Sequence, residues 1–396
     1  MSVSAGGEPA GLYVHVPFCA RACPYCDFDF EVAGSRLAPA LERWQAGLAR
    51  EFEARRGHFE GREFDSLYLG GGTPSAIGPA ALERVIAWLR SQVIGEHAAL
   101  RELTVELNPE HVDDALVEAL VRVGVDRVSL GIQSLAGAGL QQLGRAHSAS
   151  QALHALERTI AAGLRTSADL IVGWPGHRED DLLADLDRLV DAGVEHLSIY
   201  ALTIEADTPW HKLVRRGLRV LPDDDAQAPL LIAAERRLGE RGFVHYEVAS
   251  HARPGREAWH NGKYWRSVDV LALGPSGASV ELVASDRGLE VQRRRNRRGL
   301  ERWLADPGEP EEPIDRLAGE VAAGEALWLA LRRLDGLAVE PWLARFGVGF
   351  GVDRGWLRAR TDKQVRLGNL EWVGAALLRV APGRWLWHDD IAADLL

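Results

Sequence analysis

The feature that most constrains this chain is a repeated alternation of short apolar runs with segments of helical periodicity. The expected strands cover residues 11–16, 66–70, 103–107, 127–132, 168–172 and 196–202. The expected helices cover residues 36–56, 79–92, 113–123, 149–162, 179–191 and 224–241. Six strand–helix units within roughly 200 residues predict an α/β fold with a parallel sheet and right-handed crossovers, built as a barrel or partial barrel. Because such barrels keep their chemistry at the carboxyl ends of the strands, we expect the functional residues there.

The pattern changes after about residue 205, and we divide the chain accordingly. Residues 246–282 read as irregular with clustered aromatics, and residues 305–315 (ADPGEPEEPID) read as a linker. The rest predicts a small α+β domain with a strand pair at Leu377–Val380 and Arg384–Trp387. The expected parts are a tail over 1–10, a barrel over 11–205, a barrel-completing region over 206–304, the linker over 305–315 and a C-terminal domain over 316–396.

Composition excludes several classes of protein. With 46% hydrophobic and 26% charged residues, the 396-residue chain is typical of a folded globular protein. A net charge of −11 disfavours broad binding to nucleic acid. The chain has no run of 18 or more apolar residues, so no transmembrane helix is predicted. The first residues, MSVSAGGEPAG, lack the features of a secretory signal. We therefore expect a cytoplasmic protein.

All three cysteines, Cys19, Cys23 and Cys26, lie within eight residues on the loop after the first expected strand. An odd number this tightly clustered cannot form a disulfide framework, and in a reducing cytoplasm it indicates a metal or catalytic site. Three thiolates can hold three corners of a [4Fe–4S] cluster, and the chain has no fourth cysteine, so one iron is left for a small molecule. That iron can chelate the amino and carboxylate groups of S-adenosylmethionine (SAM), and an electron from the cluster can then break the S–C5′ bond to give a 5′-deoxyadenosyl radical.

Two other interpretations of the cysteines stay open. With His15 they have the ligand number of a structural zinc site, although such sites usually draw ligands from two separated elements. They also fit buried, unreactive thiols. A c-type haem attachment site is excluded because Asp27, not histidine, follows Cys26.

The segment YVHVPFCARACPYCDF strongly resembles the radical SAM superfamily, and within it the group that contains oxygen-independent coproporphyrinogen III oxidase and the heme chaperone HemW. The resemblance runs from about residue 11 to 280 and more weakly to the C-terminus. It implies a partial (β/α)6 barrel, a [4Fe–4S] cluster held by the three cysteines and SAM on the open iron. For the C-terminal part it implies a small winged-helix-like domain.

Companion motifs follow the later strands. In the motif at residues 70–74 (GGGTP), glycines at a strand end let backbone N–H groups approach an anion, and the position matches the family's loop for the methionine part of SAM. Glu106 stands in the motif ELNP, where Asn108 also fits a helix cap and Pro109 a first helical turn. By resemblance the SAM site comprises Tyr13, Tyr25, Gly71, Gly72, Thr73, Glu106, Gln133, Arg145, Asp169 and Ala201.

The motif HNxxYW at residues 260–265 resembles a HemW-type signature in which the histidine is proposed to engage heme. Imidazole is a good ligand for iron, and aromatic neighbours suit a flat macrocycle. The resemblance therefore implies heme contacts at His260, Tyr264 and Trp265, whereas an isolated histidine more often only hydrogen-bonds locally.

Three features favour a heme chaperone over the oxidase, which decarboxylates coproporphyrinogen III to protoporphyrinogen IX. Phe28 stands where the oxidase has a further cysteine, only 18 residues precede Cys19, and HNxxYW is present. Ala278 departs from the family, where a histidine is expected. The resemblance implies transfer of heme to proteins such as respiratory cytochromes and allows for a homodimer. The alternatives are the oxidase, acting as a coproporphyrinogen III dehydrogenase, and another radical SAM enzyme acting on a tetrapyrrole. Whether SAM is cleaved or only bound stays open.

Overall fold

The computed structural model describes residues 7–32, 34–95, 98–220, 223–286 and 288–396. Its centre is a run of parallel strands in chain order, as the alternation predicted. These strands are β1 (Ala10–Val16), β2 (Phe64–Gly71), β3 (Glu102–Leu107), β4 (Arg127–Gln133), β5 (Arg165–Val172) and β6 (His196–Ala201). Each begins or ends within a few residues of its prediction, because a run buried on both faces of a parallel sheet is visible as a continuous apolar stretch.

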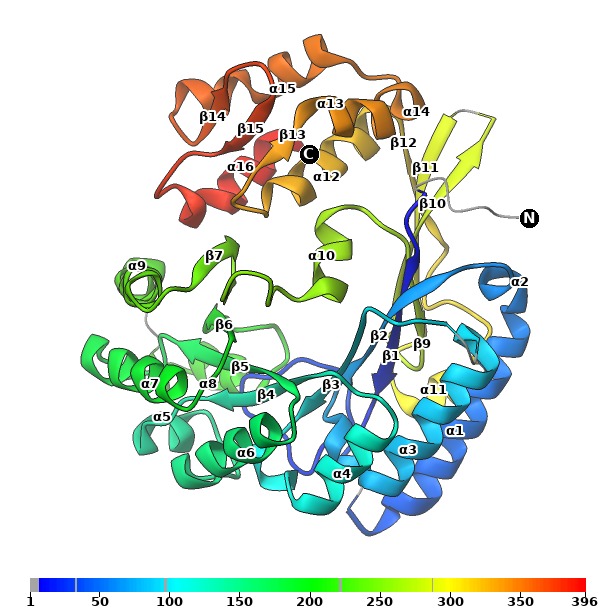
Figure 1. Ribbon diagram of the computed structural model, residues 1–396, viewed down its shortest axis with the longest axis vertical. Helices are drawn as coiled ribbons and strands as arrows, with labels where there is room; N and C mark the ends of the chain where they lie inside the picture. Colours follow the sequence, from blue (N-terminus) through cyan, green and yellow to red (C-terminus); the bar gives the residue numbers. More distant parts are fainter. Residues whose placement is uncertain (1–6, 33, 96–97, 221–222, 287) are drawn as a thin grey trace.

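The crossover helices cover one side of this sheet (Figure 1). They are α1 (Leu37–Ala54), α3 (Pro79–Leu89), α4 (Asp114–Arg122), α6 (Ala149–Ala161), α7 (Glu179–Asp191) and α9 (Asp224–Glu240), with the short helices α2 (Arg56–Phe59), α5 (Gly137–Gln142) and α8 (Pro209–Arg215) beside them. Local signals set several helix starts. Asp113 caps α4 through the Leu116 N–H, and Ser148 with Gln151 forms a capping box on α6. The main apolar core lies between these helices and the strands.

The parallel strands form an open barrel rather than a closed one. Strand β9 (Val270–Leu273) pairs in parallel with β1, and β8 (Ser250–Ala252) pairs antiparallel with β6. With β7 (Val244–Glu247), β10 (Ala278–Ser285), β11 (Gly288–Arg295) and β12 (Asp315–Ala318), the sheet has the order β12-β11-β10-β9-β1-β2-β3-β4-β5-β6-β8-β7. Strands β9 to β12 therefore continue the sheet beyond β1, and β8 and β7 continue it beyond β6. As a result β1 and β6 do not pair with each other.

The prediction that residues 246–282 are irregular was wrong. This segment contains β8, helix α10 (Trp259–Trp265), β9 and the start of β10. The strands β8 and β9 are only three and four residues long, and residues with positive φ at Ser267 (50°) and Gly274 (95°) lie between the elements of this segment. Such short pieces carry no periodicity of their own, because pairing with distant strands defines them.

The C-terminal segment forms a second apolar core beyond the opposite side of the sheet (Figure 1). A three-stranded sheet of order β13-β15-β14 comprises β13 (Leu337–Ala338), β14 (Leu370–Val373) and β15 (Leu377–Val380). The helices are α12 (Gly319–Leu331), α13 (Val339–Trp342), α14 (Val348–Phe350), α15 (Arg354–Arg366) and α16 (His388–Leu395), with α11 (Leu300–Ala305) before them. Leu282 and Val291 of the β10–β11 hairpin belong to this core, and β12 joins the large sheet at the end of the predicted linker.

One strand prediction in this segment was wrong. Leu377–Val380 is a strand, but its partners are β13 and β14, and residues 385–387 form a 3-10 turn before α16. The Trp385 indole N–H donates to Glu235 on α9 at 2.9 Å. A tertiary contact therefore buries Trp385, whereas Trp387 of the same run is exposed. Among the described residues, none of the helices combines the length and the apolar character needed to cross a membrane.

Candidate functional site

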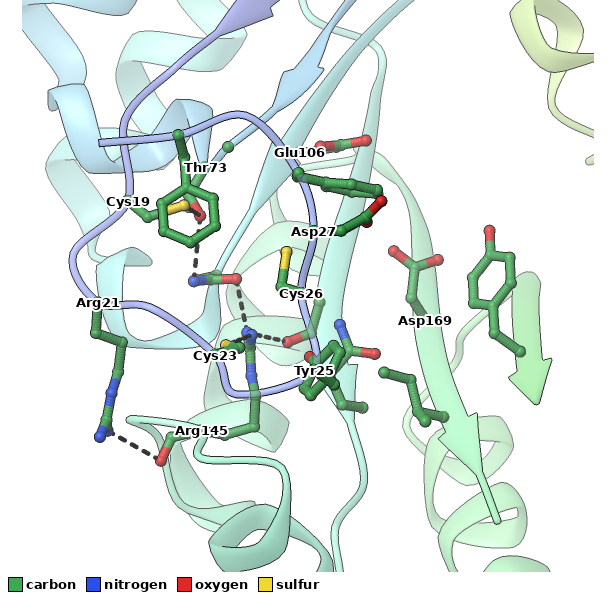
Figure 2. A pocket seen from close by; sticks show the side chains of 18 of the residues that line it. Cys19, Arg21, Cys23, Tyr25, Cys26, Asp27, Thr73, Glu106, Arg145 and Asp169 are labelled. Carbon is green, nitrogen blue, oxygen red and sulfur yellow. Dashed lines mark hydrogen bonds between the residues drawn. The ribbon is translucent and has the colours of Figure 1, made fainter. Parts of the chain in front are cut away.

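The carboxyl ends of the parallel strands surround a cavity of about 480 Å³. The loop after β1, which carries the cysteines, winds around this space together with residues from β2 to β6 (Figure 2). Nearly all residues predicted for the cluster and SAM line it. They are Cys19, Cys23, Cys26, Tyr25, Gly71, Gly72, Thr73, Glu106, Gln133, Arg145, Asp169 and Ala201. Their common location was expected from a parallel barrel.

The three thiols face the space enclosed by their loop (Figure 2). Sγ of Cys19 lies 3.3 Å from the Thr73 hydroxyl, and the Arg145 guanidinium donates to Sγ of Cys23 at 3.4 Å. Burial raises the pKa of Cys19 to about 12 and that of Cys26 to about 11. Thiols in such surroundings stay protonated unless a metal replaces the proton, because only the thiolate is a strong ligand. Three soft donors on one short loop, each able to bind a separate iron, fit a [4Fe–4S] cluster.

A single zinc ion fits this arrangement poorly. His15, the fourth ligand considered, points away from the cysteines: its Nε2 lies 2.7 Å from the Asp29 carbonyl oxygen and its Nδ1 3.2 Å from the Tyr13 hydroxyl. Within the described part of the chain, no three His, Cys, Asp or Glu side chains lie close enough together to hold one metal ion. A cluster differs because it spreads its ligands over several irons.

The glycines after β2 bring the backbone close to the cysteine loop instead of leaving N–H groups free for an anion. The Gly72 N–H donates to the Val16 carbonyl at 2.9 Å and the Thr73 N–H to the Phe18 carbonyl at 2.7 Å. A Cβ on Gly72 would lie 2.7 Å from the Val16 oxygen, so only glycine allows this approach. The expectation that these N–H groups contact an anion was therefore wrong in its mechanism, although the loop lines the cavity.

Glu106, at the end of β3, is held at both carboxylate oxygens. The Tyr68 hydroxyl donates to Oε1 at 2.7 Å and the Gly71 N–H donates to Oε2 at 3.1 Å. Burial raises the pKa of Glu106 to about 7, with the neighbouring Asp169 adding to the rise and the Tyr68 hydrogen bond opposing it. This carboxyl group thus changes its charge near neutral pH. Tyr68 was not predicted as a site residue, because the sequence around it indicates only a strand.

Arg145 joins the cysteine loop to two strand ends. Its Nη2 donates to Asn108 Oδ1 at 2.7 Å and to the Gly131 carbonyl at 2.8 Å. Asn108 lines the cavity and makes no side-chain cap on the following turn, so the cap interpretation was wrong. Pro109 does begin that turn. Asn108 was missed as a site residue because the motif ELNP equally suits a cap.

Gln133 on β4 and Asp169 on β5 also line the cavity. Gln133 has φ of 67°, unusual for a residue other than glycine, and follows a bulge between β4 and β5. Such local strain is concentrated at functional sites. Asp169 accepts from the Ser129 hydroxyl at 3.1 Å, and burial raises its pKa.

Tyr13 is the one predicted SAM residue outside the cavity lining. It lies deeper in the barrel, where its ring stacks on Tyr68 with centroids 6.1 Å apart. Tyr25 lines the cavity and packs against Trp210 on α8. Tyr13 therefore packs against Tyr68, the hydrogen-bond partner of the lining residue Glu106, without facing the space itself.

The HNxxYW residues lie away from the cysteine cavity. His260 on α10 is 1% exposed, with Nδ1 3.0 Å from the Ser66 hydroxyl and Nε2 3.5 Å from the Tyr264 hydroxyl. Tyr264 and Trp265 instead line a second, mostly apolar cavity of about 320 Å³, between α10, the β10–β11 hairpin and α12. His260 therefore contacts Tyr264 but does not line the cavity that the two aromatic side chains line, and heme contact at all three stays a prediction.

Comparison with known proteins agrees with this geometry. The family model of the Radical SAM superfamily matches residues 13–189. The chain is 33% identical over 391 residues to "Heme chaperone HemW" of Mycobacterium tuberculosis, covering 98% of this chain and 95% of that protein. It is 32% identical over 295 residues to "Heme chaperone HemW" of Escherichia coli, covering 74% of this chain and 75% of that protein.

A solved structure matches the whole architecture. The coproporphyrinogen III oxidase HemN from Escherichia coli superposes with a TM-score of 0.78 at 20% identity, covering 98% of this chain and 90% of that one. At this identity the likeness shows a shared fold.

Proposed function

Because the chain belongs to the HemW family of the radical SAM superfamily, we propose that it is a heme chaperone, which binds heme and transfers it to target proteins. The observation that carries this proposal is similarity to a named heme chaperone over almost the full length of both proteins. The cavity agrees: Phe28, 62% exposed, lines its mouth where the oxidase is expected to have a further cysteine.

We propose that Cys19, Cys23 and Cys26 hold the [4Fe–4S] cluster of this family and that SAM occupies the rest of the cavity. The cluster supplies an electron and an open iron for SAM. Arg145 places a positive charge beside Cys23, and Thr73 lies beside Cys19. Glu106 and Asp169 present buried carboxyl oxygens that can accept from the amino or ribose groups of SAM. Gln133 also lines the cavity and adds an amide.

For heme, we propose contacts at Tyr264 and Trp265 in the second cavity. Trp328 on α12 and Leu282 on β10 also line it, so a flat apolar ligand meets aromatic and aliphatic side chains there. Contact at His260 would require the ring to leave its partners Ser66 and Tyr264.

The cellular setting follows from the same family membership. We propose that the protein works in the cytoplasm, that respiratory cytochromes are among its recipients and that it does not act on nucleic acid. The proposal also allows for a homodimer. The measurable activity of the protein is the transfer of heme. The net charge of −11 supports the exclusion of nucleic acid.

The test is anaerobic and has two arms. After reconstitution of the cluster, one aliquot is titrated with heme and the other is incubated with SAM, dithionite and coproporphyrinogen III. Saturable heme binding without protoporphyrinogen formation supports the chaperone. Decarboxylated product at turnover rates would instead make the chain an oxidase. Cleavage of SAM with neither result would contradict a role with tetrapyrroles.

A further inference from the structure

We propose that His260 is a positioning residue for the carboxylate of Glu106 and acts through the ring of Tyr68. The proposal rests on the proposed function in one respect, namely that Glu106 faces SAM. It gives the histidine of HNxxYW a role inside the barrel, distinct from contact with heme.

The position of His260 is fixed from several sides. Glu102 at the start of β3 accepts the backbone N–H groups of Trp259 at 2.9 Å and His260 at 3.0 Å, which ties the start of α10 to the sheet. The imidazole lies against Gly11 on β1, where a Cβ would come 3.0 Å from the ring. With Nδ1 beside Ser66 and Nε2 beside Tyr264, the ring has little freedom to rotate.

Tyr68 is held between two rings. Its centroid lies 5.2 Å from that of His260, with 33° between the ring planes, and 6.1 Å from that of Tyr13, with 28° between the planes. A Cβ on Gly70 would lie 2.7 Å from the Tyr68 ring and 2.8 Å from Glu106 Oε1, so the chain leaves this space to the tyrosine–glutamate pair. The two flanking rings therefore direct the Tyr68 hydroxyl at Glu106, 2.7 Å away.

The hydrogen bond from Tyr68 favours the charged form of Glu106 and opposes the effect of burial. The groups that act on this carboxyl are Tyr13 from β1, Tyr68 and the Gly71 N–H from β2, Arg127 from β4, Asp169 from β5 and Tyr200 from β6. Burial and Asp169 favour the protonated acid, whereas Tyr68, Gly71 and Arg127 favour the carboxylate. With the pKa of Glu106 at about 7, losing one donor shifts the group towards the protonated acid at neutral pH. The negatively charged acceptor for the SAM amino or ribose groups would then be weakened.

The experiment uses Tyr68→Phe and His260→Ala, with Tyr246→Phe as the matched control. Tyr246 on β7 is also a partly buried tyrosine, and its hydroxyl lies 2.8 Å from His196 and accepts from the Ala258 N–H before α10 at 3.3 Å, so this variant tests the loss of a tyrosine hydroxyl next to the same helix. Infrared difference spectra of the apoprotein, assigned with Glu106→Gln, report the titration of Glu106 without any cofactor. SAM affinity against pH and heme affinity are then measured on the reconstituted protein.

We expect Tyr68→Phe to raise the titration midpoint of Glu106 by about one pH unit or more, since a hydrogen bond to a charged group is lost. His260→Ala should move it in the same direction, and SAM affinity at pH 7 should fall roughly tenfold in both variants. Heme affinity should stay unchanged, and Tyr246→Phe should match the wild type throughout.

An unchanged midpoint in Tyr68→Phe would overturn the proposal, and because that substitution removes a single oxygen atom, it stays informative even if His260→Ala fails to fold. Loss of heme binding in His260→Ala with an unchanged Glu106 midpoint would show a heme ligand instead. If the wild type binds no SAM, the proposed function fails, while the infrared midpoints still decide whether His260 positions Glu106.

Discussion

The guanidinium of Arg145 lies beside the thiol of Cys23, with Nη1 3.4 Å from Sγ. Asn108 and the Gly131 carbonyl hold the other end of this guanidinium, so the strand ends of β3 and β4 fix a positive charge against the cysteine loop. Charge and hydrogen bonds to cysteine sulfur are among the main factors that set the potential of an iron–sulfur cluster.

Replacing Arg145 by methionine should therefore lower the midpoint potential of the reconstituted cluster. A lost charge-assisted hydrogen bond of about 1.5 kcal/mol corresponds to roughly 60 mV for a one-electron couple. The potential is measured by redox titration followed by electron paramagnetic resonance. Arg43→Met, at an exposed residue paired with Glu301, is the control and should leave the potential unchanged. An equal potential in both variants would show that Arg145 does not act on the cluster.

Gly72→Ala should reduce the iron and sulfide bound per chain. The added Cβ would lie 2.7 Å from the Val16 oxygen and 2.8 Å from the Phe18 oxygen, so the cysteine loop must move away from Thr73. Such overpacking costs about 1–3 kcal/mol, and a lower melting temperature should accompany the loss. Gly137→Ala is the matched control, since nothing lies within 4 Å of its Cβ. Full cluster content in Gly72→Ala would contradict the close approach of the two loops.

Gln133→Gly should stabilise the apoprotein and weaken SAM binding at the same time. A residue with a Cβ at φ of 67° is destabilised by about 1–2 kcal/mol, and glycine removes this strain. Glycine also makes the unfolded chain more flexible, which offsets part of the gain. The free energy of unfolding should therefore rise by about 1 kcal/mol. Gln133→Ala keeps the strain and removes the amide, so it should weaken SAM binding without raising the melting temperature. Thermal unfolding and equilibrium dialysis with SAM separate the two effects. Equal melting temperatures for the glycine and alanine variants would refute the strain.

Glu106→Gln should stabilise the apoprotein more at pH 8 than at pH 5. Burial raises the pKa of Glu106 from 4.5 to about 7, so the folded state holds this proton more tightly than the unfolded chain. The contribution of this group to the free energy of unfolding of the wild type is fully present below pH 4.5. It falls as the pH rises towards 7 and stays low above pH 7. The glutamine variant avoids this loss, which is on the order of 3 kcal/mol. Unfolding midpoints at both pH values check it.

Glu118→Gln, at an exposed position of α4, is the control for the substitution itself and is measured at the same two pH values. A gain in Glu106→Gln that is the same at pH 5 and pH 8 would mean that the Glu106 carboxyl does not titrate between them.

Much of the site could be predicted because its residues follow strands that are visible locally. Gly71, Glu106 and Gln133 each end a strand whose apolar run is continuous in the sequence, and parallel pairing brings those ends to one edge of the sheet. Asn108 and Tyr68 could not be assigned in this way. The partner of Asn108, Arg145, lies 37 residues further along the chain, and that of Tyr68, Glu106, lies 38 residues further along.

The sequence by itself determined the rhythm of strands and helices, the three cysteines on one loop and the order of the motifs around them, because periodicity, residue type and spacing are local properties. Only the tertiary structure decided that the Gly72 and Thr73 N–H groups bind the Val16 and Phe18 carbonyls, that Tyr13 stacks on Tyr68 outside the cavity lining and that His260 packs against Tyr68. Those facts depend on strand register and on side chains that meet from distant segments. No local pattern records these contacts, because they arise only when the sheet forms and α10 packs inside it.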